Sequence, residues 1–445
     1  MDSFDPSQYF DLHFNMKLFL LLSFLAHSWS LEGDIGQTRL HGGQEFPLVG
    51  LGVGNLQHDL IESHVANGMD LGYRLVDTAH ASKNEHLIAN GVKEGLIANP
   101  DAEMHVVTKV WYTYLGYERT KISVRESLEQ LNNPNIRVHM LLHWPRCRDD
   151  IPWMKCEEEE TALPQAVKDA GPAPHLDREN AFKESWRALE DIFLGKISLG
   201  EGLPEVVSIG VSNFDLDDLK ALAEGARVVP HILQDNVWSL AFNPYLMEYC
   251  KEKNIHFEAY NVMNGILGNR DAAPFADDAL GDVVQRYNDD PDEGDEGDMT
   301  HAQVILKWLT QNDISVIPRT TQREHLNGNS PKVIESIPDL DEEEERIVET
   351  AVAALLRGVD LEPPEVSFVN KHDSILHIFW WDEDEEEEVL VKEGLKPGQT
   401  WNTSTFSGHV FLVYDESDYK KSREFTIEAG FGERDEIHID GLDEL

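Results

Sequence analysis

The sequence predicts a (β/α)8 barrel followed by a small all-β sandwich, in a chain of 445 residues. From about residue 46, short β-branched or apolar runs alternate with longer amphipathic ones, which is typical of βα units around a parallel sheet. Polar residues end or directly follow most of the strand-like runs, as they do at the mouth of a barrel. After Pro363-Pro364 the pattern changes to period two with paired aromatic residues, which predicts a separate set of strands.

Eight strand-like runs, with helical stretches between them, account for the barrel. The first run lies near Leu48–Leu51, and the others are Arg74–Val76, His105–Thr108, Val138–Leu142, Val206–Val211, His231–Leu233, His256–Ala259 and Ile314–Ile317. The helical stretches are Leu60–Leu71, Asn84–Leu96, Arg119–Leu131, Ala181–Phe193, Leu216–Glu224, Pro244–Lys253, His301–Gln311 and a closing Asp341–Leu356. A Gly-x-Gly-x-x-Gly turn after the first strand is absent, which argues against an open doubly wound sheet.

Two charged insertions interrupt the barrel pattern, at about 146–177 and 267–298. Both fall at the predicted mouth, where they can cover a site. We assign 31–358 to the barrel, 359–365 to a linker, 366–432 to the β domain and 433–445 to an acidic tail. The strand-like runs of the β domain are Val366–Val369, Ser374–Trp381, Glu388–Val391, Thr400–Thr405, His409–Tyr414 and Arg423–Ile427.

The amino-terminal segment 1–30 is typical of a secretory signal peptide. Lys17 leads into the apolar run Leu18–Ala26, and Met16 is an alternative start. The run is shorter than the ~20 residues that a transmembrane helix needs. A signal anchor or a chance apolar segment is the competing interpretation. Together with the final Leu442-Asp443-Glu444-Leu445, which is similar to endoplasmic reticulum retrieval signals, it predicts a protein of the secretory pathway, in the endoplasmic reticulum lumen.

Composition excludes several classes of function. The net charge of -46 repels phosphate backbones, so nucleic acid is not an expected partner. Three cysteines are too few for a disulfide scaffold or a zinc ribbon, and no metal site is predicted. Cys147 and Cys156 share one insertion and can pair in an oxidising lumen, whereas Cys250 sits on a helical pattern and is interpreted as a buried thiol.

Three strand-end residues suit the reduction of a carbonyl by a nicotinamide hydride. That reaction needs a proton for the developing alkoxide and groups that stabilise its charge. A Lys109–Asp77 pair can supply the charge, and His143 can orient the carbonyl. Spacing alone leaves a second interpretation open, in which Asp77 and Lys109 form a structural ion pair with His143 hydrogen-bonded nearby.

Five segments, in order, resemble the aldo-keto reductases over about residues 46–356. They are Tyr73-Arg74-Leu75-Val76-Asp77-Thr78-Ala79, Thr108-Lys109-Val110-Trp111, Leu141-Leu142-His143-Trp144-Pro145, Ile209-Gly210-Val211-Ser212-Asn213-Phe214 and Val316-Ile317-Pro318-Arg319. The resemblance implies a catalytic tetrad of Asp, Tyr, Lys and His, of which Asp77, Lys109 and His143 match. Ser82 stands where the family has its proton-donating tyrosine. A serine hydroxyl stops about 4 Å short of a tyrosine oxygen.

The same resemblance implies a cofactor site for NADP, with NAD as an alternative. It assigns Ser212, Asn213 and Gln234 to the nicotinamide carboxamide and Tyr260 to stacking on the ring. On the adenosine side the implied residues are Arg319, Thr320, His325 and Asn329. His325 replaces an arginine that usually grips the 2′-phosphate. Trp111 and Trp144 are the implied substrate-pocket walls, whereas Gly54 stands where many members carry a tryptophan.

The second domain, over about 362–430, resembles the β domain of the von Hippel-Lindau tumour suppressor. The resemblance rests on Val366-Ser367-Phe368-Val369-Asn370, Ile378-Phe379-Trp380-Trp381, Leu395-Lys396-Pro397-Gly398 and Phe406-Ser407-Gly408-His409-Val410-Phe411. It implies a peptide or protein ligand, bound by Trp381, Thr405, His409 and Phe411. A purely structural sandwich is the alternative.

Two functions follow from these patterns. The first is an NADPH-dependent oxidoreductase that reduces a small carbonyl substrate with an impaired tetrad, Tyr replaced by Ser82. The second is a catalytically silent nucleotide-binding barrel that serves as a peptide- or protein-binding protein through its β domain.

Overall fold

The computed structural model describes residues 36–288, 299–382, 387–405, 409–427, 429, 432 and 434–444. The predicted signal peptide, 1–30, lies outside these residues. Two compact units are present: the first extends to Leu356 without Asn269–Ala279, and the second consists of Asn269–Ala279 and the residues from Arg357 onwards. No helix in the described part of the chain is long and apolar enough to cross a membrane.

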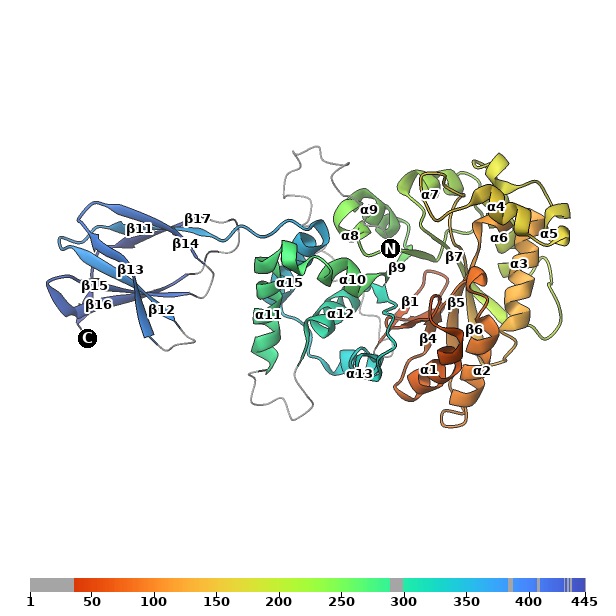
Figure 1. Ribbon diagram of the computed structural model, residues 1–445, viewed down its shortest axis with the longest axis horizontal. Coiled ribbons are helices and arrows are strands. Elements are labelled where there is room, and N and C mark those ends of the chain that lie inside the picture. The colour runs from red at the N-terminus through yellow and green to blue at the C-terminus, as the bar shows by residue number, and fades with distance from the viewer. Residues whose placement is uncertain are drawn as a thin grey trace. The chain divides into compact units, whose positions relative to one another are not determined.

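The first unit contains an eight-stranded parallel sheet (Figure 1). Its strands follow chain order: β3 (Leu51–Gly52), β4 (Leu75–Asp77), β5 (Met104–Val110), β6 (Ile136–Leu142), β7 (Glu205–Ser212), β8 (Ile232–Asn236), β9 (His256–Tyr260) and β10 (Ser315–Val316). Val316 N donates to Leu48 O, and Gly50 N donates to Val316 O, both at 2.8 Å, so the two end strands are joined. Each predicted run overlaps one of these strands, as a (β/α)8 barrel requires.

Helices between the strands complete the βα units. They are α1 (His58–Asp70), α2 (Glu85–Gly95), α3 (Tyr117–Gln130), α6 (Ala181–Phe193), α7 (Leu216–Ala223), α8 (Ser239–Phe242), α9 (Pro244–Glu252), α12 (His301–Gln311) and α15 (Glu342–Arg357). Several of the long helices bury an apolar stripe. On α6, for example, Phe182, Trp186 and Leu189 recur at helical spacing and are at most 1% exposed.

The predicted insertions contain helices rather than irregular loops. The first holds α4 (Cys156–Ala162), α5 (Gln165–Asp169) and a 3-10 turn, η5 (Pro174–Leu176). The second includes α10 (Val262–Leu267), η6 (Arg270–Ala272) and α11 (Pro274–Asn288), and its residues 289–298 lie outside the described chain. Two further short helices, α13 (Arg323–Gly328) and α14 (Pro331–Ser336), follow β10.

A hairpin closes the amino-terminal end of the barrel. It is formed by β1 (Gln37–Arg39) and β2 (Glu45–Pro47), which pair antiparallel. Phe46 from this hairpin is fully buried and meets the rings of His139 and His256 edge-on, with centroids at 4.8 and 5.5 Å. The barrel interior at this end is therefore packed, which leaves the opposite, carboxyl end of the strands for chemistry.

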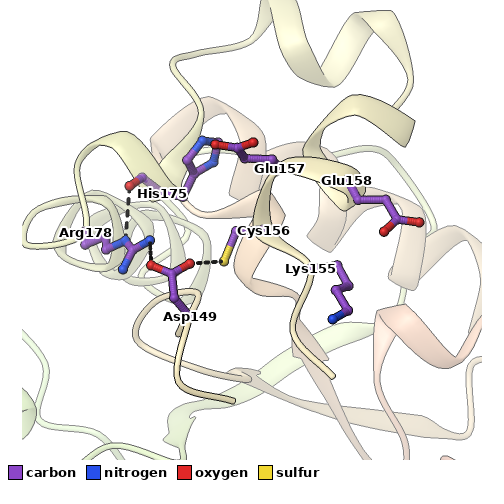
Figure 2. A pocket seen from close by; sticks show the side chains of 7 residues that line it. All are labelled: Asp149, Lys155, Cys156, Glu157, Glu158, His175 and Arg178. Carbon is purple, nitrogen blue, oxygen red and sulfur yellow. Dashed lines mark hydrogen bonds and ion pairs between the residues drawn. The ribbon is translucent and has the colours of Figure 1, made fainter. Parts of the chain in front are cut away.

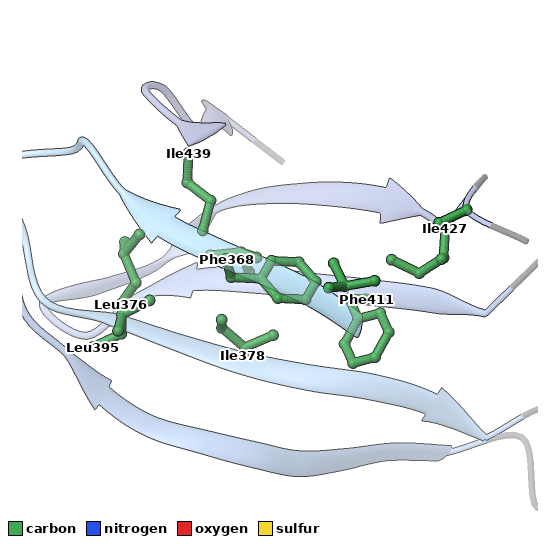
Figure 3. Packing of buried hydrophobic residues seen from close by; sticks show 10 residues of the cluster. Phe368, Leu376, Ile378, Leu395, Phe411, Ile427 and Ile439 are labelled. Atoms are coloured by element: carbon green, nitrogen blue, oxygen red, sulfur yellow. The ribbon is translucent and has the colours of Figure 1, made fainter. Parts of the chain in front are cut away.

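The second unit contains two facing sheets. The three-stranded sheet has the order β14 (Thr400–Ser404), β11 (Glu365–Asn370), β17 (Arg434–Ile439). The five-stranded sheet has the order β13 (Glu387–Leu395), β12 (Leu376–Asp382), β15 (Val410–Asp415), β16 (Asp418–Thr426), β18 (Asp443–Glu444). Phe368 of β11 packs against Ile378 and Phe411 in the core between the sheets (Figure 3). The core is that of a sandwich.

The structure extends this domain beyond the boundary expected from the sequence. Residues 433–445 were expected to form an acidic tail, yet β17 pairs in parallel with β11 and β18 pairs with β16. The reason is apolar: Ile439 is fully buried in the core and Ile437 packs against it. The acidic residues Asp435 and Glu436 remain exposed. Composition alone therefore suggested an acidic tail where the structure has a strand.

Candidate active site

The carboxyl ends of the barrel strands carry a polar layer directly after an apolar one. Four apolar residues on β4, β5, β6 and β8 belong to the inner core cluster: Leu75, Val107, Leu141 and Ile232. Side chains two positions apart on a strand point to the same side. The residues two positions further along are therefore directed to the mouth of the barrel, and they are Asp77, Lys109, His143 and Gln234.

Asp77 and Lys109 form a buried ion pair. Lys109 Nζ donates to Asp77 Oδ1 at 2.5 Å and to the backbone oxygen of Thr78 at 2.6 Å. Lys109 is 3% exposed and Asp77 is 8% exposed. Charges removed from water are costly unless they are paired and hydrogen-bonded. Each residue therefore fixes the other, and the pair holds the ammonium group of Lys109 in place at the floor of the site.

Gln234 links this pair to a residue that the sequence analysis missed, Glu258. Gln234 Nε2 donates to Asp77 Oδ1 and to Glu258 Oε2, both at 2.7 Å. The contact follows from register, because Gln234 on β8 lies opposite Glu258 on β9. Burial, and then the nearby Asp77 carboxylate, raise the pKa of Glu258 to about 8. The sequence signal for Glu258 is a carboxylate inside the predicted strand His256–Ala259, because a charged residue is seldom buried without a partner.

His143 follows β6 and lies beside the aromatic wall of the site. Its ring meets Trp111 edge-on, with centroids 4.9 Å apart. Burial, with a contribution from the charge of Lys109, holds the pKa of His143 well below its usual value, so the imidazole is neutral at pH 7. Its Nδ1 is buried and has no hydrogen-bond partner among the described residues. A neutral imidazole can donate one hydrogen bond to a substrate oxygen.

Ser82 ends the 3-10 turn η3 (His80–Ser82) and is half-buried. Its hydroxyl makes no hydrogen bond to another described residue, Lys109 and Asp77 included. The turn is anchored elsewhere, because Thr78 Oγ1 donates to Asn84 Oδ1 at 2.6 Å and Asn84 Nδ2 donates to Val53 O at 3.1 Å. The structure thus brings three members of the predicted tetrad to the mouth, with Ser82 at its edge.

The residues expected at the nicotinamide meet in one network. Asn213 has a left-handed backbone, with φ of 59°, which asparagine tolerates better than most residues. Asn213 Nδ2 donates to the backbone oxygen of His143 at 2.9 Å and to Ser212 Oγ at 3.0 Å. Its Oδ1 accepts a hydrogen bond from the Tyr260 hydroxyl at 2.7 Å. Ser212, Asn213 and Tyr260 are therefore held together at the ends of β7 and β9.

The predicted adenosine-side residues lie between β10 and the end of α13. Arg319 and His325 are exposed, and Asn329 is buried. The side chains of Arg319, His325 and a further residue, Arg323, make no ion pair or hydrogen bond with any residue that the structure describes. Thr320 Oγ1 accepts from Gln322 N at 3.0 Å. Arg323 was not predicted, because Glu324 is its neighbour in the sequence and only the structure shows that the two side chains do not pair.

The two predicted tryptophans of the pocket wall are joined by a third, Trp153, from the first insertion. Trp153 stacks on Trp111 with centroids 6.2 Å apart and meets Trp144 edge-on at 5.7 Å. Trp153 is 54% exposed. On the other side, Trp111 Nε1 donates to Glu159 Oε2 at 2.7 Å. The insertion therefore holds the wall from both ends.

A disulfide closes a short loop at the start of this insertion. Cys147 and Cys156 are bonded, with their Cα atoms 5.9 Å apart, as the sequence allowed. Cys147 lies four residues after His143, and Cys156 begins α4, which carries Glu159. Cys250 is the buried free thiol that was expected, and burial raises its pKa to about 12.

A separate polar hollow of about 310 Å³ opens in the same insertion (Figure 2). Arg178 lies along it, donating to Asp149 Oδ2 at 2.6 Å and to the backbone oxygen of His175 at 3.2 Å. Lys155, Cys156, Glu157 and Glu158 complete its lining. None of the predicted site residues line it, and no cluster of metal-ligating side chains is found within the described chain.

In the β domain, the structure brings together two of the four predicted residues. Thr405 Oγ1 and His409 Nδ1 are 2.9 Å apart. Phe411 is 3% exposed and belongs to the core. Trp380, rather than Trp381, contacts His409, with ring centroids 5.3 Å apart. Side chains alternate along a strand, so Trp381 points to the opposite face of β12 from Trp380.

Comparison with known proteins agrees with this fold. The model of the Aldo/keto reductase family matches residues 52–351. An uncharacterized oxidoreductase of Bacillus subtilis is 29% identical over 301 residues, covering 66% of this chain and 86% of the relative. Glyoxal reductase of the same organism is 28% identical over 300 residues (66% and 85%), and an NADPH-dependent aldose reductase of Saccharomyces cerevisiae is 27% identical over 303 (65% and 86%).

Solved structures share the barrel. A Bombyx mori aldo-keto reductase in complex with NADP has a TM-score of 0.54 at 21% identity, covering 72% of this chain and 93% of that one. A mutant of Gox0644 in complex with NADPH has a TM-score of 0.52 at 24% identity, covering 72% and 94%. The shared barrel and the family match define the class of protein, an oxidoreductase of this architecture. The chain belongs to the aldo/keto reductase family.

Proposed function

We propose that this chain is an NADPH-dependent reductase of small carbonyl compounds that works without a tyrosine proton donor. The observation that carries the proposal is the buried Lys109–Asp77 pair at the mouth that also holds a neutral His143. Three of the four tetrad positions keep the residue types expected from the family, whereas Ser82 replaces the tyrosine and has no phenol. Loss of a positioned general acid typically costs about 10²- to 10⁴-fold in rate, so we expect slow turnover.

The strand-end residues suit a nicotinamide dinucleotide. A carboxamide both donates and accepts hydrogen bonds, and the network of Ser212, Asn213 and Gln234 offers both kinds of partner. Arg319 and Arg323 are exposed cations without a described acidic partner, which suits a phosphate group. These features support NADPH, and the relatives include reductases named for that cofactor.

The chain's own residues define how reduction proceeds. Bound NADPH supplies the hydride. His143, being neutral, donates a hydrogen bond to the substrate oxygen and orients the carbonyl. The ammonium of Lys109, fixed by Asp77, stabilises the negative charge that develops on that oxygen. Because the hydroxyl of Ser82 is too short to reach it, solvent water at this position delivers the proton, and the remaining hydroxide is neutralised by exchange with bulk solvent.

Binding and turnover should be measured separately on the purified full chain. NADPH is titrated by its fluorescence, and its consumption is followed with glyoxal, glyceraldehyde, xylose and an aromatic aldehyde. We expect saturable binding and slow consumption, which His143→Asn abolishes while leaving binding intact. An absence of saturable binding up to millimolar NADPH or NADH removes the oxidoreductase proposal. Normal binding with no turnover on any aldehyde favours the second candidate.

The second candidate is a nucleotide-binding barrel without turnover, with the β domain as a peptide-binding module. Its support is local: Trp380 Nε1 is buried without a described partner, beside His409 and Thr405. The resemblance to the von Hippel-Lindau β domain makes a hydroxyproline peptide the first probe, with the matching proline peptide as control. Binding lost in His409→Ala and kept in Thr403→Ala, an edge-strand control, supports it. Equal binding of both peptides, or of neither, counts against it.

We also propose that the protein matures in the secretory pathway. The Cys147–Cys156 bond supports this location, since disulfides persist in oxidising compartments. Asn402, in the sequon Asn402-Thr403-Ser404, is exposed on β14, an edge strand. Expression in a eukaryotic cell should give a glycosidase-sensitive product that loses its shift in Asn402→Gln. An unmodified product with an intact amino terminus contradicts the proposal.

A further inference from the structure

Glu258 is a buried acid that the proposed reaction does not use. It is fully buried on β9, inside the barrel, and its Oε2 accepts from Gln234 Nε2 at 2.7 Å. Its Oε1 is buried and has no hydrogen-bond partner among the described residues. A buried carboxylate normally has several donors, so one unpartnered oxygen indicates a group for which ionisation is costly.

Few charged groups surround Glu258, and their net charge can be added directly. Asp77 on β4 and Lys109 on β5 face it from across the barrel and neutralise each other. On β10, the residue in register is Ser315, which is uncharged, and His256 on β9 itself has a lowered pKa. His143 is also neutral. The net charge of the floor is therefore set by Glu258 alone: zero when it is protonated and minus one when it is ionised.

Glu258 lies between two of the four residues assigned above to the nicotinamide, Gln234 and Tyr260. Gln234 Nε2 bonds it directly, and the same nitrogen bonds Asp77. Tyr260 is two positions further along β9, on the same face. The two forms of the cofactor differ in charge at this end, since the oxidised nicotinamide ring is a cation and the reduced ring is neutral.

We propose that Glu258 is a titratable selector of cofactor redox form: as a carboxylate it favours the oxidised nucleotide, and as a neutral acid it favours the reduced one. This inference rests on the proposed function, because it requires nicotinamide at Gln234 and Tyr260. Burial and the nearby Asp77 raise the pKa of Glu258 to about 8 in the free protein, so we expect the balance to change in the mildly alkaline range. A cationic ring lowers the pKa of this acid in the complex, and binding of NADP⁺ consequently releases protons.

The test is the affinity of the full chain for NADPH and for NADP⁺ between pH 6.5 and 9.5. The ratio of the two dissociation constants isolates the ring, because the 2′-phosphate and adenine are common to both. We expect the preference for NADP⁺ to rise about ten-fold with pH, which corresponds to a one-unit difference in the Glu258 pKa between the two complexes. Calorimetry of NADP⁺ binding in two buffers of different ionisation enthalpy should show proton release near pH 8.

Glu258→Gln keeps the shape and the contact with Gln234 but cannot ionise. In this variant the ratio should be independent of pH, and proton release should vanish. The wild-type profile needs no variant, so a folding defect in Glu258→Gln does not leave the question open. A pH-independent ratio in the wild type overturns the inference. If neither nucleotide binds, it is the proposed function that fails.

Discussion

Ser82 lies beside Gly54 at the edge of the barrel mouth: a Cβ placed on Gly54 would lie 3.4 Å from Ser82 Oγ. These are the two positions at which aromatic side chains were expected from the family resemblance and small residues stand instead. The nearest other atom to that Cβ is Thr78 Cα, at 3.9 Å. Ser82 and Gly54 are therefore neighbours in space. A larger side chain at either position would take up space that the other now leaves open.

Ser82→Tyr should raise aldehyde reduction at least ten-fold, since it restores a general acid next to a site that keeps Lys109 and Asp77. Steady-state consumption of NADPH measures the change. Ser82→Phe, which adds the ring without the hydroxyl, is the matched control and should not gain activity. Ser82→Ala should change little. Were Ser82→Ala to abolish native turnover, serine would be the working donor and our account of the site would be wrong.

Lys109→Met should destabilise the barrel by about 3–5 kcal/mol, because it leaves the buried Asp77 carboxylate without its cation. Urea unfolding followed by tryptophan fluorescence measures this. Asp77→Asn combined with Lys109→Met should cost less than the sum of the single changes, as expected for a coupled pair. Lys93→Met on the exposed face of α2 serves as the control. Additive effects would show that the two charges do not depend on each other.

Arg323→Ala and Arg319→Ala should each weaken NADPH binding about ten-fold and leave NADH nearly unchanged. The 2′-phosphate is the only difference between these nucleotides, and both arginines are exposed without a described acidic partner. Fluorescence titration of the two cofactors provides the comparison, with Lys93→Ala as the control for net charge. Equal losses for NADPH and NADH would place these side chains away from the phosphate.

His231→Asn should flatten the acid sensitivity of the barrel. Burial lowers the pKa of His231 to about 4, whereas an unfolded histidine has a pKa of about 6.5. The unfolded state binds the proton first, so the stability contributed by neutral His231 is lost as pH falls from about 6.5 to 4. The wild type should lose about 3 kcal/mol relative to the variant over this range.

Glu258 acts in the opposite sense, because its raised pKa favours the folded state as pH falls below 8. Comparison of wild type with His231→Asn by urea unfolding at pH 7, 6, 5 and 4 therefore isolates the histidine. A constant difference in unfolding free energy across these pH values would mean that His231 is protonated alike in both states.

The barrel was predictable because most of its strands are apolar runs in the sequence and end in, or are followed by, a polar residue. Asp77, Lys109, His143 and Gln234 could all be named in this way. Glu258 could not, since only the register of β8 and β9 shows that it meets Gln234.

Trp153 and Trp380 were missed for related physical reasons. Trp153 belongs to an insertion with no strand or helix pattern, and only the folded disulfide loop brings it onto Trp111. Trp380 and its neighbour Trp381 are identical in type, so composition cannot decide which one faces His409. Strand alternation, once the register of β12 is known, decides it.

The bond between Cys147 and Cys156 has a consequence for how substrates are received. It closes a short loop over the residues that carry Trp153 and joins the segment after His143 to the helix whose Glu159 holds Trp111. Because the disulfide orders this wall, the conformational entropy of the loop is lost when the bond forms. It is then not lost again when a ligand binds. Reduction of this one bond should therefore weaken ligand capture mainly through entropy, with the contacts of the bound state unchanged.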